Sequence, residues 1–261
     1  ANHRLGLLPD DVAAAIDGAC DDIIEGRFHK HFVVDVIQGG AGTSTNMNAN
    51  EVIANRALER MGQKPGQYDV VHPNNHVNLS QSTNDAYPTS LKLGILLSIG
   101  DLTAAMKHLQ DAFRDKEREF ADVIKMGRTQ LQDAVPMTLG QEFGAYATML
   151  GEDIAILKKA GLLLTEINMG GTAIGTGINA DPRYAELVTR ELAEISGHPL
   201  VVAENLVEAT QDTGAFVQLS GVFKRIVVKL SKVCNDLRLL SSGPRTGFNE
   251  INLPPMQPGS S

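Results

Sequence analysis

The sequence predicts an all-α protein, a bundle of long helices that other copies of the chain complete. Three segments of roughly thirty residues each carry apolar side chains at helical spacing, and each helix would span about 45 Å. The apolar faces of these segments are wider than three helices can bury among themselves, so other subunits are expected to cover the remainder. The third observation is that a cluster of polar residues directly precedes each of three expected helices, as it does where a helix N-terminus is capped.

Two shorter helices are expected before the long ones. Residues 9–26 form an amphipathic pattern, and residues 47–61 a second one that ends at Gly62, a natural C-cap. Between them, residues 32–37 are expected to be extended or turn-like.

The long helices are expected from Asp85 to about Glu119, from about Pro136 to about Ile167 and from about Asp212 to Ser242. A polar linker at 125–136 should precede the second, with Asp133 as its N-cap. A Gly- and Thr-rich loop at 168–179 and a short helix at about 182–196 should follow it. One face of the second long helix carries Leu139, Phe143, Ala147, Leu150, Ile154 and Leu157.

Charge and composition exclude several classes of function. The net charge is -8 and the pI about 5.4, which gives no support for binding nucleic acid or an anionic membrane. No apolar run approaches the ~20 residues that span a bilayer, and no signal peptide is seen, so a cytoplasmic protein is expected. Cys20 and Cys234 lie in helical patterns and are predicted to be reduced core residues.

The row Ser82-Thr83-Asn84-Asp85 is predicted to start the first long helix, because these residue types cap helices and Pro88 fits a first turn. Free N–H groups and the positive end of the dipole would face outward there, which suits an anion. One cap needs only one such residue. Four in a row favour a binding site over an ordinary cap, and both interpretations stay open.

Two further polar clusters precede helices: Thr43-Ser44-Thr45-Asn46 and Thr129-Gln130. The Gly-rich stretch before Thr43 matches neither the P-loop nor the dinucleotide spacing. Hydroxyls, amides and helix N-termini together fit a small carboxylate, to which Lys125 and Arg128 could add positive charge. The seven histidines show no metal-ligand spacing, so no metal and no cofactor are expected.

Four motifs carry a family resemblance: Gly-Gly-Ala-Gly-Thr-Ser-Thr-Asn-Met-Asn (39–48), Gln-Ser-Thr-Asn-Asp (81–85), Gly-Arg-Thr-Gln-Leu-Gln-Asp-Ala-Val-Pro (127–136) and Gly-Ser-Ser (259–261). Together they resemble the aspartase/fumarase superfamily, and the aspartate ammonia-lyases in particular. The resemblance covers nearly the whole chain in order.

The resemblance implies an all-helical homotetramer with five bundle helices per subunit and active sites built from three subunits. It implies reversible anti elimination of ammonia from L-aspartate to give fumarate, through an aci-carboxylate intermediate. The residues that match the family's substrate-binding set are Thr43, Ser82, Thr83, Asn84, Thr129 and Ser261. Ser260 matches the serine that acts as the general base.

The ends of the chain bear on these expectations. It starts at Ala1 without Met and stops at Ser261, where the family's serine loop continues through a Lys and an Asn that contact substrate. We expect either a fragment or the ordered part of a longer chain. The expected domains are an N-terminal helical domain (1–80, incomplete at its start) and a central bundle domain (81–261, incomplete at its end). This polypeptide by itself is expected to be inactive.

Two alternatives stay open. A fumarase of this superfamily typically carries His after the Thr of the third motif, where this chain has Gln130. A non-catalytic scaffold is the other alternative, because members of the superfamily have been recruited as structural proteins and a truncated chain could assemble without turnover.

Overall fold

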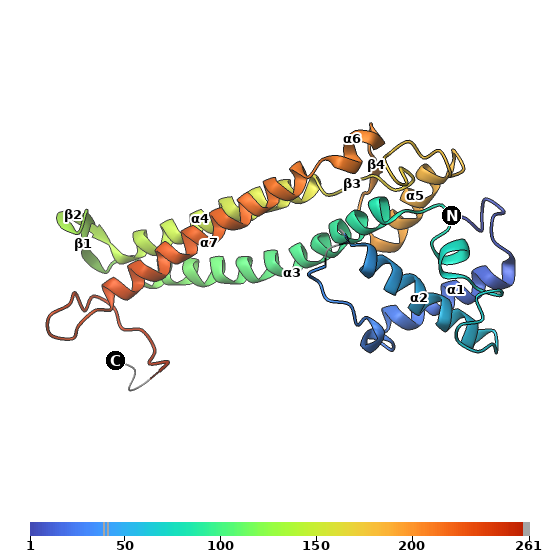
Figure 1. Ribbon diagram of the computed structural model, residues 1–261. Coiled ribbons are helices and arrows are strands. Elements are labelled where there is room, and N and C mark those ends of the chain that lie inside the picture. The colour runs from blue at the N-terminus through green and yellow to red at the C-terminus, as the bar shows by residue number, and fades with distance from the viewer. Residues whose placement is uncertain (39, 41, 258–261) are drawn as a thin grey trace. The chain divides into compact units, whose positions relative to one another are not determined.

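The computed structural model describes residues 1–38, 40 and 42–257, and long helices dominate it (Figure 1), which confirms the predicted all-α class. The helices are α1 (Asp10–Ile24), α2 (Thr43–Arg60), α3 (Thr83–Glu119), α4 (Leu139–Leu162), α5 (Tyr184–Ser196), α6 (Leu206–Gln211) and α7 (Gly214–Leu240). Short helical turns lie at His29–His31 (η1) and Pro73–Val77 (η2). The strands are β1 (Ile124–Thr129), β2 (Gln132–Thr138), β3 (Glu166–Ile167) and β4 (Val201–Val202).

The chain forms two compact units. The first contains residues 1–96 and 163–213, and the second contains residues 97–162 and the described residues from 214 on. The predicted domains at 1–80 and 81–261 stay a prediction, because the compact units group residues only by contact within one chain.

The core of the first unit lies between α1 and α2. Small side chains let the two helices approach closely, and the buried set is Val12, Ala15, Ala19, Ala54, Ala57, Leu58 and Val71. The carboxylate of Asp22, also buried, accepts from Arg56 Nε at 2.6 Å and from Arg60 Nη1 at 3.0 Å. The hydrogen bond from Arg56, more than any other contact, lowers the pKa of Asp22.

The second unit is built on regularly spaced apolar faces. The predicted face of α4 is buried along its whole length, from Leu139 to Leu157. α7 packs along α4 (Figure 1) and buries Val222 together with four residues that recur every seven positions: Leu219, Ile226, Val233 and Leu240. A heptad spacing keeps one seam of a helix turned toward its neighbour.

Aromatic rings join α3 to α4 within this unit. The ring centroid of Phe113 on α3 lies 6.1 Å from that of Phe143 and 5.6 Å from that of Tyr146, both on α4. Gly140 and Gly144 of α4 allow the close approach of α3. A Cβ at Gly140, for example, would lie 2.5 Å from the carbonyl oxygen of Glu117.

Large apolar side chains remain exposed on α3 and α7. Leu97 of α3 is 62% exposed, and Val217, Val227 and Val228 of α7 are 60–68% exposed. By length and composition alone, α3 is also apolar enough to cross a membrane, the single such helix among the described residues. Lys92 and Asp101 interrupt this stretch, so the finding does not contradict the expectation that no unbroken apolar run comes near that length.

The predicted linker at 125–136 is wrong. β1 and β2 form an antiparallel hairpin there, with Arg128 opposite Asp133 and Thr129 opposite Gln132. The turn consists of Gln130 and Leu131, whose φ angles are 51° and 64°. Asp133 and Pro136 therefore lie in β2, and α4 begins only at Leu139.

Other boundaries differ in smaller ways. The last long helix is divided into α6 and α7, and α4 ends at Leu162 before the short parallel pair of β3 and β4. Cys234 is exposed and Cys20 is half-buried, so the core assignment of Cys234 was wrong. Burial raises the pKa of the Cys20 thiol to about 11, with further contributions from Asp17 and Asp21.

Candidate functional site

The first turns of α2 and α3 meet through side-chain amides and hydroxyls. Asn46 on α2 donates from Nδ2 to Thr83 Oγ1 on α3 at 3.0 Å and to Asn78 Oδ1 at 3.3 Å. Asn50, one turn further along α2, also donates to Asn78 Oδ1, at 3.1 Å. The first two predicted polar clusters are therefore brought together in the first compact unit.

Gly42 makes this approach sterically feasible. It precedes α2 with φ 91°, and a Cβ built on it would lie 2.2 Å from the ring of Tyr87 on α3. Glycine tolerates the left-handed conformation and also leaves room for the ring.

The hydrogen bonds at this junction fix the polarity of two hydroxyls. Thr83 Oγ1 accepts from Asn46, and Ser82 Oγ accepts from the backbone N–H of Asn84 at 3.2 Å. Amide N–H groups can only donate. Each hydroxyl is thus left with its own hydrogen to donate, which suits a carboxylate ligand.

The two helix starts are largely capped from within the chain. For α2, Gln38 Oε1 accepts from the N–H of Ser44 at 2.9 Å and of Thr45 at 3.3 Å. For α3, Ser82 and Asp85 form a reciprocal capping box, in which Asp85 Oδ1 accepts from the Ser82 N–H at 2.9 Å. The N–H of Thr83 has no acceptor among the described residues.

These caps correct two expectations. The cluster at 43–46 does not precede its helix but forms the first turn of α2. Most N–H groups expected to face an anion are already used, so hydroxyl and amide side chains supply the donors instead.

Asp85 is the fully buried centre of this region. Its Oδ2 accepts from the backbone N–H of Gly170 at 3.2 Å and of Thr172 at 2.9 Å. Burial raises the pKa of Asp85, and the backbone hydrogen bonds oppose that rise in part.

The Gly- and Thr-rich loop at 168–179 is thereby held against the start of α3. Asn84 Nδ2 donates to the carbonyl of Ala173 at 2.7 Å, and Asn168 Nδ2 donates to the carbonyl of Asn84 at 3.0 Å. The sequence placed Asn46 and Asp85 in the predicted polar clusters but not among the predicted site residues, and neither Asn168 nor this loop was assigned a role. For Asp85 a signal existed, since an acidic residue three positions after Ser82 is a capping-box spacing.

The predicted site residues fall in three places. Thr43, Ser82, Thr83 and Asn84 lie together in the first unit, where Thr43 and Asn84 are exposed and the other two are half-buried. Thr129 lies in the second unit, exposed at the end of β1 rather than ahead of a helix start. Ser260 and Ser261 lie outside the described residues. The role of each stays a prediction.

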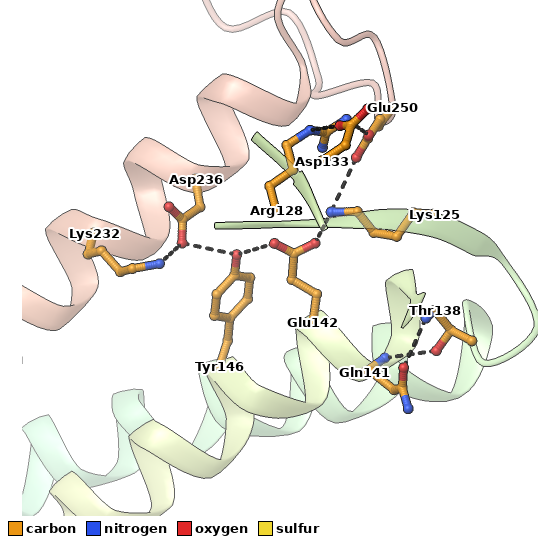
Figure 2. A network of polar contacts seen from close by, with 10 residues as sticks. All are labelled: Lys125, Arg128, Asp133, Thr138, Gln141, Glu142, Tyr146, Lys232, Asp236 and Glu250. Atoms are coloured by element: carbon orange, nitrogen blue, oxygen red, sulfur yellow. Dashed lines mark hydrogen bonds and ion pairs between the residues drawn. The ribbon is translucent and has the colours of Figure 1, made fainter. Parts of the chain in front are cut away.

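Lys125 and Arg128 belong to a dense network of ion pairs in the second unit (Figure 2). Lys125 pairs with Glu142 and, at 3.2 Å, with Glu250, while Arg128 pairs with Glu250 at 2.5 Å. The hydroxyl of Tyr146 lies 3.3 Å from carboxylate oxygens of Glu142 and Asp236. Burial, followed by these two charges, raises the pKa of Tyr146.

A cavity of about 310 Å³ adjoins the network and is lined by Lys125, Arg128, Gln130, Glu142, Lys232 and Asp236, together with apolar side chains. Because its charged groups are paired with one another, Lys125 and Arg128 are not the free positive charges that the sequence suggested. No three His, Cys, Asp or Glu side chains gather in the described part of the chain where a metal ion could be held.

Comparison with known proteins gives one family. The family model described as "Lyase" matches residues 1–261. The chain is 67% identical to the aspartate ammonia-lyase of Pseudomonas aeruginosa over 262 residues, covering 100% of this chain and 55% of the relative. It is 64% identical to that of Helicobacter pylori, covering 56% of the relative, and 54% identical to that of Escherichia coli, covering 55% of the relative; each match covers 100% of this chain.

Two solved structures share the fold. A structure described as fumarate lyase:delta crystallin from Brucella melitensis bound to cobalt matches with a TM-score of 0.98 and 61% identity, over 99% of this chain and 56% of that one. Class II fumarase from Schistosoma mansoni matches with a TM-score of 0.94 and 36% identity, over 100% of this chain and 58% of that one. The chain thus spans slightly more than half the length of the proteins it matches.

Proposed function

Since this chain belongs to the lyase family, within the aspartase/fumarase superfamily, we propose that it forms part of an aspartate ammonia-lyase. The reaction is the reversible elimination of ammonia from L-aspartate to give fumarate. The high identity to aspartate ammonia-lyases over the whole chain supports this proposal.

The chemistry requires stabilisation of a carbanion. A base removes a proton from Cβ, and the negative charge spreads onto the neighbouring carboxylate as an aci-carboxylate before the C–N bond breaks and ammonia leaves. Donors already in place where this charge develops lower the barrier, provided that they bind the intermediate more strongly than the substrate.

The hydroxyls of Ser82 and Thr83 are the observation that carries the proposal. Each accepts a hydrogen bond from an N–H group of this chain and keeps its own hydrogen, which it can donate to a carboxylate. Together with Asn84, which follows them in sequence, and Thr43, which begins α2, they form the part of the proposed substrate-binding set that lies in the first unit. Thr129 and Ser261 complete the proposed set.

Ser260 is the proposed general base. A serine hydroxyl is a weak base unless neighbouring donors or charges stabilise its anion. Gln130 has no acid–base capacity near neutral pH, so it cannot protonate the leaving group.

We further propose a cytoplasmic homotetramer in which each active site combines residues of three subunits. The exposed valines of α7 and Leu97 of α3 support this, because association would remove them from water. Val228→Asp should weaken the tetramer in size-exclusion chromatography with light scattering, while a folded protein that keeps its mass would contradict this interface.

One experiment separates the proposed activity from its alternatives. The purified full-length protein is given aspartate or malate, and fumarate formation is followed by its ultraviolet absorbance. Fumarate and ammonia from aspartate alone, lost in Ser260→Ala, support the proposal. Fumarate from malate instead would make the protein a hydratase. Turnover of neither substrate would favour a scaffold.

A further inference from the structure

Asp85 joins two segments of the first unit that lie far apart in sequence, the start of α3 and the Gly- and Thr-rich loop. One oxygen of its carboxylate, Oδ1, accepts from the backbone N–H of Ser82 at 2.9 Å. The other, Oδ2, accepts from the N–H groups of Gly170 at 3.2 Å and Thr172 at 2.9 Å. The side chain is fully buried, so water cannot take over any of these three bonds.

The three bonds require a carboxylate. An ionised aspartate offers acceptors on both oxygens and no donor, whereas the side chain of asparagine offers an oxygen on one side and an NH2 group on the other. All three partners of Asp85 are N–H donors, and they approach both of its oxygens. Asp85→Asn would therefore set an NH2 group against at least one backbone N–H.

The loop follows a strained path to reach Asp85. Gly170 has φ 91° and Thr172 has φ 54°, and the second value is costly for a β-branched residue. A Cβ at Gly170 would also lie 2.6 Å from that of Ala185, so the loop is packed tightly there. Such a conformation persists only where surrounding contacts hold it. Asp85 supplies two of those contacts.

The docked loop in turn orients Asn84, which belongs to the proposed substrate-binding set. Asn84 Nδ2 donates to the carbonyl of Ala173 at 2.7 Å. Because a carbonyl can only accept, the nitrogen must face the loop, and Oδ1 and the second N–H of the amide are left without a partner among the described residues. Asn168 holds the backbone of the same residue, since its Nδ2 donates to the carbonyl of Asn84 at 3.0 Å and to Thr210 Oγ1 at 3.1 Å.

We propose that Asp85 is a positioning residue: by docking the loop on the start of α3, its carboxylate fixes the amide of Asn84 in the orientation that meets substrate. This inference rests on the proposed function and deepens it. Asp85 touches no reacting atom, because it is buried and both of its oxygens accept from backbone N–H groups. Its effect reaches the substrate through Ala173 and Asn84.

The first measurement is the docking of the loop in the full-length protein. Asp85→Asn keeps the size of the side chain, and it should raise the rate of amide hydrogen exchange in peptides that cover 168–173 at least roughly tenfold. Asp22→Asn is the matched control. Asp22 is also buried in the first unit, but it accepts from Arg56 and Arg60 instead. Its variant should leave exchange in 168–173 unchanged.

The second measurement is kcat/KM for aspartate, per folded molecule as judged by circular dichroism. Misplacement of a binding group by about 1 Å can cost roughly 100-fold in rate, so Asp85→Asn should lower kcat/KM at least about tenfold. Asp22→Asn should keep the parental value. Faster exchange in Asp85→Asn beside a parental kcat/KM would overturn the inference, and so would exchange that stays parental.

A double-mutant cycle separates positioning from a purely structural role. Asn84→Ala removes the amide through which Asp85 acts, so Asp85→Asn should cost clearly less in that background than in the parental protein. Equal losses in both backgrounds would overturn the inference. If Asp85→Asn does not fold, Thr210→Val takes its place, because it removes one partner of Asn168 and loosens the same loop. Faster exchange in 168–173 and a lower kcat/KM are expected, and a parental kcat/KM would again overturn the inference.

Failure of the proposed function is recognised separately. A parental protein that releases no fumarate and ammonia from aspartate rejects that function, while hydrogen exchange still tests the docking by Asp85. Turnover of aspartate by the parental protein, beside a parental kcat/KM in Asp85→Asn, rejects the positioning role alone.

Discussion

Asn46 Nδ2 lies 3.0 Å from Thr83 Oγ1 and donates to it, which joins the first turn of α2 to the first turn of α3. Because the Nδ2 group can only donate, this bond occupies one lone pair of the Thr83 hydroxyl and leaves its hydrogen for a ligand.

Asn46→Asp should reverse that polarity. The new carboxylate accepts from Thr83, so the hydroxyl no longer donates to substrate. A hydrogen bond to a charged group is worth about 1.5–3 kcal/mol, and kcat/KM for aspartate should fall roughly 10- to 100-fold. Steady-state kinetics measures this.

Two variants separate polarity from charge. Asn75→Asp makes the same charge change at an exposed position and should have little effect. Thr83→Val should cost almost nothing further once Asn46→Asp is present. Independent, additive losses would contradict the role of the hydrogen bond.

Gly42→Ala should destabilise the protein more than Gly62→Ala does. Both glycines have positive φ, 91° and 72°, so each substitution costs about 1–2 kcal/mol of backbone strain. At Gly42 the new Cβ also meets the Tyr87 ring, whereas at Gly62 it meets nothing within 4 Å. Overpacking should add about 1–3 kcal/mol at Gly42. Urea unfolding compares the two, and equal midpoints would show that the ring moves away freely.

Leu131→Gly should be more stable than Leu131→Ala by about 1 kcal/mol, because alanine keeps the Cβ that strains the left-handed conformation and glycine removes it. The side chain is 65% exposed, so neither change loses much packing. Thermal unfolding of the two variants provides the measurement. A more stable alanine variant would mean that the turn carries no such strain.

The ion pairs of Glu250 should make the free energy of unfolding depend on pH. Its pKa is lowered in the folded protein, so its contribution is fully present above the unfolded value of about 4.3 and is lost as the pH falls through the folded value. Between pH about 5 and about 3, the free energy of unfolding of the parental protein should therefore fall more steeply than that of Glu250→Gln. Parallel curves would indicate that the ion pairs contribute nothing to folding.

Regular elements were predictable from sequence where one face is buried continuously. The face of α4 from Leu139 to Leu157 repeats every three or four residues, and that spacing alone identifies a core helix. The start of α3 was also predictable, because Ser82 and Asp85 stand at the spacing of a capping box.

The hairpin could not be predicted in this way. Two-residue turns of its type usually contain Asn-Gly or Asp-Gly, whereas Gln130-Leu131 carries no such signal. The polar residues around it looked like a linker for the same reason.

Contacts between segments that are distant in sequence could not be predicted from the sequence either. Asn46 and Thr83 are 37 positions apart, and Arg128 and Glu250 are 122 positions apart. No local periodicity reports such pairs. The sequence could nominate the hydroxyls of Ser82 and Thr83, but only the fold shows which atoms are left to donate.

The two-residue turn has a consequence for how this hairpin tolerates change. Successive strand side chains point to opposite faces, so one inserted or deleted turn residue would invert the pairing parity of everything beyond it. Asp133, which lies opposite Arg128 and 3.5 Å from its Nε, would then turn to the other face of the hairpin. A one-residue change in the length of the turn would therefore need a compensating irregularity, like the one between Met126 and Arg128, whereas a change of residue type at Gln130 would not.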